Sequence, residues 1–321
     1  MPVIERPYVP IRKHPIYTGD YYIQTSSIDN LLSEVTNWID SRNPGGIIYG
    51  RARIGKTRAI HNLIIQIKQI YGEDLPIFNV LMSEHKPSEK FFYLEMLKDI
   101  GHTLAKSNRP ASDLKTNLVN HLISEGKSSS MNQVIIFIDE ANFMSMDDFN
   151  YLIDIYNRLE RAQVRMTVLL VGTKELISLK TALMQMNKQQ IVERFMVREF
   201  HFRGIQSLKD LQICLASYDY SEYPENSGWS FTKYFYPEAV SNGQKLYSLA
   251  DEILSYFNEA LGTGIIEIPM QYVTSTIENC FRRFGSDGSN VYFPSKEEWM
   301  QAIKDSGYVI AENRFEGCKA V

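Results

Sequence analysis

The chain has 321 residues, 44% of them apolar and 22% charged, which is the balance of an ordinary globular protein and excludes a disordered or collagen-like one. Its 34 basic and 38 acidic residues give a net charge of −4, so contact with DNA or RNA would require a local basic patch. No apolar run approaches the roughly 18 residues of a membrane span, and the N-terminus lacks the apolar stretch of a secretory signal. Its three widely spaced cysteines form neither a metal motif nor a disulfide framework. We therefore expect a cytoplasmic protein with no membrane partner.

The N-terminal segment is rich in proline. Four prolines stand within the first fifteen residues, at Pro2, Pro7, Pro10 and Pro15. Because proline fixes φ and removes a hydrogen-bond donor, residues 1–25 are predicted to form an extended arm, either a frayed terminus or a docking arm for a partner. Ser26 or Ser27 can cap a following helix, whose apolar residues recur at helical spacing as far as Ile39. A turn at residues 43–46 ends it.

Short apolar segments then alternate with helical patterns up to residue 203. The predicted strands cover residues 47–49, 77–82, 134–138, 166–171 and 197–202. The predicted helices between them cover about 59–70, 88–106, 112–125 and 145–161. Strands separated by helices indicate a parallel sheet with helices on both faces, and wholly apolar strands suit that burial. The fold class is therefore α/β, with residues 26–203 as its domain.

Strand signals stop at Gly204. Helices are predicted over 207–216, 244–260, 270–284 and 295–303. Residues 204–285 are expected to form a smaller helical lid domain, and residues 286–321 a C-terminal segment. The stretch 218–236 is aromatic and polar without a clear period, so it is interpreted as a loop insertion or, alternatively, as a surface for a partner.

Residues 50–57 match the pattern G-x-x-x-x-G-K-[ST] in full, after an apolar strand and at the start of a helix. They are Gly50, Arg51, Ala52, Arg53, Ile54, Gly55, Lys56 and Thr57. The glycines let backbone N–H groups point at phosphate oxygens, and the helix N-terminus favours their negative charge. Lys56 is expected to reach the β- and γ-phosphates and Thr57 to ligate the metal. The segment predicts a site for ATP and Mg²⁺.

An acidic pair, Asp139 and Glu140, follows the strand at 134–138. The carboxyl end of a parallel strand is where ligands bind, so Asp139 is expected to hold Mg²⁺ through a water molecule. Glu140 is placed to orient or deprotonate a water that attacks the γ-phosphate. The alternative is a pair of acids that only cap a helix. The second acid favours hydrolysis over binding alone.

Two further positions are candidates for the same chemistry. Thr173 follows the fourth strand and would lie between the P-loop strand and the acidic strand, where its hydroxyl could position the attacking water or serve only in a turn. Arg194 precedes the fifth strand, and an arginine there can act on the γ-phosphate of a neighbouring subunit. The alternatives for Arg194 are a surface ion pair and the rival residue Arg198.

These pieces together resemble an AAA+ ATPase: a P-loop, an Asp-Glu strand, a polar residue after strand four, an arginine before strand five and a helical lid. More narrowly, the chain resembles the TnsC/TniB group of transposon ATPases over about residues 20–280. The segments that carry this likeness are GRARIGKT, VIIFIDEAN, LLVGTKEL and IVERF. The chain departs from the pattern by lacking an extra P-loop glycine, and by having Lys245 where the lid sensor is commonly an arginine. Lys245 is the expected substitute.

The resemblance implies an ATP-dependent ring or helical filament of identical chains around double-stranded DNA. Such proteins receive a TniQ-type target selector or targeting complex, and recruit a TnsA/TnsB-type transposase. ATP hydrolysis would then act as a timer for disassembly. Two rival readings are a helicase-loader-like or signalling AAA+ ATPase without a transposase partner, and a monomeric P-loop kinase for a small molecule.

Binding to DNA phosphates requires lysine or arginine. The resemblance places the segment after the second strand at the central pore, so Lys86 and Lys90 are the first candidates and Arg109 and Lys115 the next. The alternative is that these are ordinary solvated side chains. The six histidines show no paired metal spacing, and we expect them on the surface or as hydrogen-bonded core residues.

Overall fold

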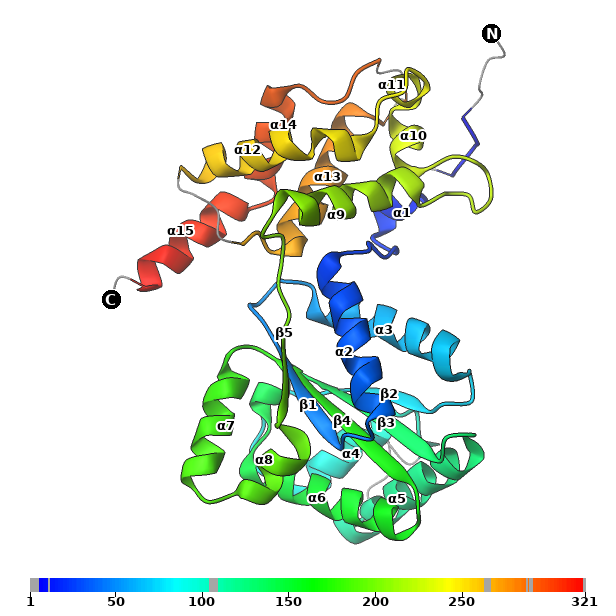
Figure 1. The fold of residues 1–321 in the computed structure, drawn as a ribbon, viewed down its shortest axis with the longest axis vertical. Helices are drawn as coiled ribbons and strands as arrows, with labels where there is room; N and C mark the ends of the chain where they lie inside the picture. The colour runs from blue at the N-terminus through cyan, green and yellow to red at the C-terminus, as the bar shows by residue number, and fades with distance from the viewer. Residues whose placement is uncertain are drawn as a thin grey trace. The chain divides into compact units, whose positions relative to one another are not determined.

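The structure is a computed structural model that describes residues 6–10, 12–103, 109–262, 267–286, 288 and 291–319. The chain divides into two compact units (Figure 1). The sheet unit contains residues 30–52 and 56–202, and the helical unit contains residues 1–29, 53–55 and 203–321. Among the described residues, no helix is both long and apolar enough to cross a bilayer.

A five-stranded parallel sheet forms the centre of the sheet unit. Its strands are β1 (Gly45–Tyr49), β2 (Ile77–Leu81), β3 (Gln133–Asp139), β4 (Arg165–Gly172) and β5 (Arg198–His201). They are ordered β2-β3-β4-β1-β5, and every neighbouring pair is parallel. All of β3 and nearly all of β4 are buried, as wholly apolar central strands require. The predicted parallel α/β sheet is confirmed.

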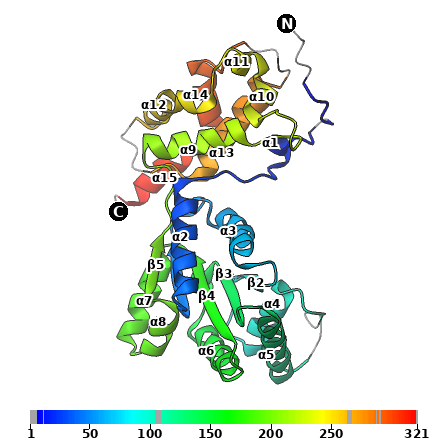
Figure 2. The ribbon, with the colours of Figure 1, turned by 45° about the vertical axis from the view of Figure 1, so that its right-hand side comes forward.

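Helices cover both faces of this sheet. They are α2 (Ser26–Asp40), α3 (Lys56–Tyr71), α4 (Glu89–Asp99), α5 (Ala111–Ser128), η2 (Ala141–Phe143), α6 (Met146–Arg161), α7 (Glu175–Gln185) and α8 (Gln189–Phe195). Helices α4, α5 and α6 pack on β2, β3 and β4 and share one large core with them (Figure 2). The ring of Trp38 in α2 lies so close to Gly46 in β1 that a Cβ there would meet it at 2.6 Å. That strand position therefore requires glycine.

The helical unit has its own apolar core. Its elements are α1 (Pro15–Thr18), α9 (Leu208–Tyr220), α10 (Phe231–Phe235), α11 (Pro237–Ser241), η3 (Leu246–Leu249), α12 (Ala250–Leu261), α13 (Met270–Phe284), α14 (Lys296–Asp305) and α15 (Tyr308–Lys319). Trp299 and Tyr308 are buried in this core, so these parts of the predicted C-terminal segment, residues 286–321, pack with the lid helices.

The stretch 218–236 is a loop only in its middle part, residues 221–230, between α9 and α10. Tyr218 is fully buried in the last turns of α9, and Phe235 and Tyr236 are fully buried at the end of α10. Helix α10 has only five residues, which is too short for a helical period to show in the sequence. Most of these aromatic side chains belong to the core of the helical unit.

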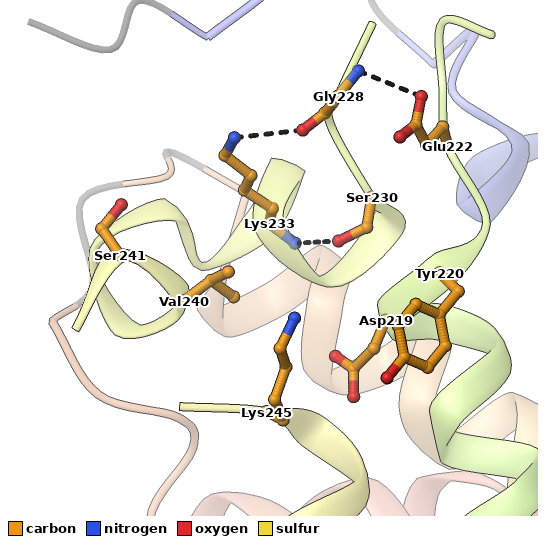
Figure 3. A pocket seen from close by; sticks show the side chains of 9 residues that line it. All are labelled: Asp219, Tyr220, Glu222, Gly228, Ser230, Lys233, Val240, Ser241 and Lys245. Carbon is orange, nitrogen blue, oxygen red and sulfur yellow. Dashed lines mark hydrogen bonds between the residues drawn. The ribbon is translucent and has the colours of Figure 1, made fainter. Parts of the chain in front are cut away.

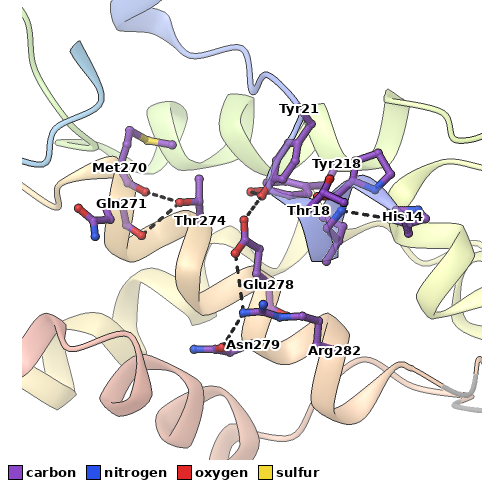
Figure 4. A network of polar contacts seen from close by, with 12 residues as sticks. His14, Thr18, Tyr21, Tyr218, Met270, Gln271, Thr274, Glu278, Asn279 and Arg282 are labelled. Atoms are coloured by element: carbon purple, nitrogen blue, oxygen red, sulfur yellow. Dashed lines mark hydrogen bonds and ion pairs between the residues drawn. The ribbon is translucent and has the colours of Figure 1, made fainter. Parts of the chain in front are cut away.

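The predicted extended arm, residues 1–25, is also different. Within its described part, α1 forms and Ile16 is fully buried in the core of the helical unit. The hydroxyl of Tyr21 donates a hydrogen bond of 2.6 Å to Glu278 and lies 3.3 Å from the hydroxyl of Tyr218 (Figure 4). The prolines limit helix length, but the apolar residues between them still pack. The arm is therefore held by the lid helices rather than frayed.

His14 makes the stability of the helical unit dependent on pH. Its side chain is 1% exposed, its Nδ1 accepts a hydrogen bond from the N–H of Ile16, and the rings of Tyr234 and Phe235 lie 4.5 and 5.0 Å away. Burial and then the charge of Arg6 lower its pKa from 6.5 to about 4. Between pH 6.5 and pH 4 the unfolded chain therefore binds a proton at His14 that the folded chain does not bind. The contribution of His14 to the free energy of unfolding is fully present above pH 6.5 and is lost as the pH falls toward 4.

We expect the free energy of unfolding to drop by about 2–3 kcal/mol between pH 7 and pH 4.5 from this group. Urea unfolding at the two pH values measures the drop. In His14→Phe the difference between the two pH values should shrink by that amount. An unchanged difference in the variant would contradict this account of His14.

Candidate nucleotide site

The site lies at the carboxyl edge of the parallel sheet. Because β4 lies between β1 and β3, the segments that follow these three strands lie next to one another at this edge. Tyr49 at the end of β1 is in register with Gly172 at the end of β4, and the N–H of Gly50 donates to the carbonyl of Gly172 at 3.2 Å. The P-loop, the acidic pair and the residue after β4 are thus brought together by the strand order.

The loop between β1 and α3 has the backbone of a phosphate cradle. Arg53 and Gly55 adopt positive φ values of 63° and 103°, and only glycine reaches the second of these without strain. Helix α3 begins at Lys56, directly after the loop. The backbone N–H groups at the start of a helix favour a bound anion.

Lys56 is the cation of the site. Its ammonium group is largely buried and donates to the carbonyls of Gly50 at 3.1 Å and Arg51 at 2.9 Å. Burial lowers the pKa of Lys56, while the nearby charges of Glu140 and Asp139 partly offset that effect. Lys56, Asp139 and Glu140 are therefore close enough for their charges to interact.

Thr57 and Asp139 form the candidate magnesium site. The hydroxyl of Thr57 donates to Oδ2 of Asp139 at 2.7 Å, and Asp139 is 2% exposed. Mg²⁺ prefers oxygen ligands and is usually held by one or two protein groups together with substrate phosphates and water. A hydroxyl and a carboxylate in contact beside a P-loop fit this ion. When bound, it would neutralise charge on the phosphates.

Glu140 has the geometry of a poised group rather than of a helix cap. Its backbone is left-handed at φ 54°, which is uncommon for a residue other than glycine. It precedes η2, yet its side chain makes no capping hydrogen bond, whereas its own N–H is held by Oδ1 of Asp139 at 2.9 Å. Within the part of the chain that the structure describes, the half-buried carboxylate of Glu140 is therefore not used as a helix cap.

The structure adds Asn142, which sequence reasoning missed. Its Oδ1 accepts the N–H of Thr173 at 3.2 Å and so links the segment after β3 to the end of β4. A Cβ on Gly172 would meet this oxygen at 2.5 Å. The hydroxyl of Thr173 accepts the N–H of Glu175 at 3.3 Å. The signals in the sequence were the asparagine two residues after Glu140 and the Gly-Thr pair after β4.

Arg194 and Arg198 lie at the other end of the sheet. Arg198 begins β5 and is in register with Gly46 near the start of β1, so neither arginine belongs to the nucleotide site of its own chain. The guanidinium of Arg194 lies 5.1 Å from the ring centre of Tyr156, and its Nη1 is buried without a hydrogen-bond partner among the described residues. Arg198 is exposed. Arg198 is therefore more accessible to a second chain than Arg194.

The DNA candidates differ in availability. Lys86 and Arg109 are exposed, and Lys90 is half-buried in the first turn of α4. Lys115 forms an ion pair of 2.6 Å with Asp154 in α6. Lys115 would have to give up that pair to contact a phosphate, so it is the least available of the four.

Lys245 lies in the helical unit, where it lines a cavity of about 330 Å³ (Figure 3). Its ammonium is 5.7 Å from the ring centre of Tyr220. Asp219, on the same cavity, accepts the backbone N–H groups of Leu246 and Tyr247 and thereby fixes the start of η3. A sensor role for Lys245 stays a prediction.

Comparison with known proteins agrees with the fold. Residues 39–179 match the protein family described as an AAA domain. The protein has the AAA+ fold. The ORC2 protein of Aeropyrum pernix, in complexes with ADPNP and ADP, superposes with a TM-score of 0.62 at 12% identity, over 91% of this chain and 71% of that one. At such identity the likeness concerns the AAA+ fold alone.

Two further AAA+-like structures are similar. The ADP form of Aeropyrum pernix ORC2 has a TM-score of 0.58 at 13% identity, over 95% of this chain and 72% of that one. Drosophila ORC bound to DNA has a TM-score of 0.50 at 10% identity, over 94% and 68%. No curated protein matches the chain in sequence.

Proposed function

We propose that the protein is an ATP-dependent, double-stranded-DNA-binding AAA+ regulator of DNA transposition. The observation that carries the ATPase part is the contact of Thr57 with Asp139 beside Lys56, with the carboxylate of Glu140 near Lys56 and not used to cap η2. The DNA-binding part is supported by the fold it has in common with a DNA-bound ORC structure. The transposition part rests on the sequence resemblance to the TnsC/TniB group.

Four side chains would each have a separate role in hydrolysis. Lys56 donates to the β- and γ-phosphate oxygens, and Thr57 and Asp139 would hold Mg²⁺. Glu140 accepts a proton from the water as its oxygen bonds to the γ-phosphorus and the bond to the β-phosphate oxygen breaks. The products are ADP and phosphate, and the proton rests on Glu140.

A second chain would complete the site. We propose Arg198 as the residue that reaches the γ-phosphate of a neighbour, and Arg194 as a packing residue on Tyr156. Arg198→Ala should lower ATP turnover by about 10³-fold with unchanged stability. Arg194→Ala should instead lower the free energy of unfolding by about 1 kcal/mol through the lost ring contact. ATP turnover and urea unfolding of both variants distinguish the two roles. A large loss of turnover in Arg194→Ala but not in Arg198→Ala would identify Arg194 as the residue that reaches the γ-phosphate.

The wider proposal is a chain that assembles on target DNA in the ATP state. It would link a TniQ-type target selector to a TnsA/TnsB-type transposase, and hydrolysis would disassemble it. Lys86, Lys90 and Arg109 are the proposed phosphate contacts, and Lys115 is a weaker candidate because of its ion pair with Asp154.

The test is binding to random-sequence duplex DNA with ATP, with ADP and without nucleotide, at low and moderate salt, observed by negative-stain microscopy. Rings or filaments that form on DNA only with ATP support the proposal. ATP turnover without DNA-dependent assembly contradicts it. Lys86→Glu should weaken the DNA complexes, whereas Lys68→Glu on α3 is the matched control.

A loader or initiator function without a transposase partner is the second candidate, because the similar solved structures include ORC proteins. The two functions differ in what joins the ATP-bound DNA complex. Retention of a purified TnsB-type transposase on that complex favours transposition. Retention of a replicative helicase instead favours the loader.

A further inference from the structure

A buried histidine anchors the loop that joins β2 to α4. The side chain of His85 is 6% exposed, and its Nε2 lies 3.2 and 3.4 Å from the two carboxylate oxygens of the fully buried Asp148 in α6. Its Nδ1 lies 2.8 Å from the carbonyl oxygen of Ser83. The ring stacks on Phe91 of α4 with centres 4.5 Å apart. The loop is therefore held against two helices by one side chain.

Both ring nitrogens of His85 must carry a proton in this geometry. A carbonyl oxygen can only accept, so Nδ1 donates to Ser83. Asp148 is an acceptor toward Ser145, since it takes the N–H and the hydroxyl of that residue, each at 2.7 Å. The remaining partner of that carboxylate, Nε2, is then a donor as well. His85 is an imidazolium that is paired with a buried carboxylate.

The charged groups around this pair are identifiable. Asp148 is the carboxylate in contact with the ring. The other charged side chains on the segments packed there are Glu84 and Lys86 on the loop, Glu89 and Lys90 at the start of α4, and Asp147 in α6.

The pair joins two segments that leave the nucleotide site. The N–H of Met82, at the start of the loop, donates to the carbonyl of Asp139 at 2.9 Å. The segment that follows Glu140 passes through η2 to the capping box of Ser145 and Asp148. The loop that carries Lys86 is therefore linked twice to the segment that carries Glu140, once through Met82 and Asp139 and once through His85 and Asp148.

We propose that protonated His85 is a positioning residue that fixes the Lys86 loop for DNA contact and connects it to the Glu140 segment. The DNA part of this inference rests on the proposed function. Without the His85 ring the contacts to Ser83 and to Asp148 are both lost. The loop then gains freedom, and the affinity for DNA falls.

The protonation itself is measured on the unaltered protein. In ¹⁵N spectra of histidine-labelled protein at pH 7, both ring nitrogens of His85 should be protonated, and the Ser83–Pro87 segment should be protected from proteolysis. A neutral His85 ring at pH 7 overturns the proposal whatever the protein does with DNA.

The consequence for DNA is tested with a random-sequence duplex and ATP at constant salt and constant pH. His85→Gln should bind DNA about tenfold more weakly than wild type, as expected for the loss of one charge-assisted hydrogen bond. Asp148→Asn should behave like His85→Gln, and the exposed-site control His61→Gln should behave like wild type.

Two outcomes separate the positioning role of His85 from the proposed function. If wild type binds no DNA but His85 is doubly protonated and His85→Gln exposes the loop to protease, His85 positions the loop and the DNA function fails. If DNA binds with ATP and His85→Gln has wild-type affinity, the DNA function stands and the positioning role is wrong.

Discussion

Replacing Glu140 with Gln is expected to lower ATP turnover by about 10²–10⁴-fold while leaving ATP binding intact. The carboxylate is the group placed to take the proton of the attacking water, because Asp139 is committed to Thr57 and to the N–H of Glu140 itself. Gln keeps the size and cannot accept that proton. The left-handed backbone at this position is retained, so the site stays folded.

The same variant should prolong the DNA complexes, since the proposed timer no longer runs. Steady-state turnover and the dissociation rate of the protein from duplex DNA in ATP measure the two effects. Asp147→Asn is the matched control, because Asp147 is an exposed acid on the first turn of α6 and should change neither value. Normal turnover by the Glu140→Gln protein would refute the assigned role.

The parallel sheet and the P-loop were predictable because both depend on short-range patterns. A wholly apolar run such as 134–138, set between helical patterns, favours a strand with helices on both faces, and the acids that follow it then lie at the ligand-binding edge. The spacing within residues 50–57 needs no information from the rest of the chain. Each of these features can be recognised from a short segment of sequence, and the strand order brings the segments together in the structure.

What the sequence did not reveal depends on contacts between distant residues. The bond of Asn142 to Thr173 and the pair of His85 with Asp148 join segments 31 and 63 residues apart. Neither pairing leaves a period or a motif. A single histidine in a loop looks the same whether it is solvated or buried against a carboxylate.

Short elements were missed for a related reason. Helix α7 buries only Leu176 and Leu183, one residue in each of two turns, so the period is too weak to separate it from a loop. The aromatic stretch before α11 and the proline-rich arm were interpreted by composition. In both, tertiary packing of a few apolar side chains overrides the local preference, as the burial of Ile16 and Phe235 illustrates.

Lys56→Ala is the second variant with a large expected effect, namely the loss of ATP-dependent assembly on DNA. Lys56 is the largely buried cation at the phosphate cradle, and removal of its charge-assisted hydrogen bonds to phosphate should weaken ATP binding about 100-fold. Wild-type protein should gain about 2.7 kcal/mol of unfolding free energy when ATP is present at 100 times its Kd, and the variant should gain almost none. Thermal unfolding with and without ATP measures this gain.

The variant should remain folded, which makes the result interpretable. Burial lowers the pKa of Lys56, so loss of the charge itself should cost little stability in the absence of ATP. Lys68→Ala is the control on the same helix, since Lys68 pairs only weakly with Glu73 at 3.9 Å. If Lys56→Ala kept the ATP-induced stabilisation, the loop of residues 50–57 would not be the nucleotide site. If it lost that stabilisation yet still assembled on DNA, assembly would not depend on ATP.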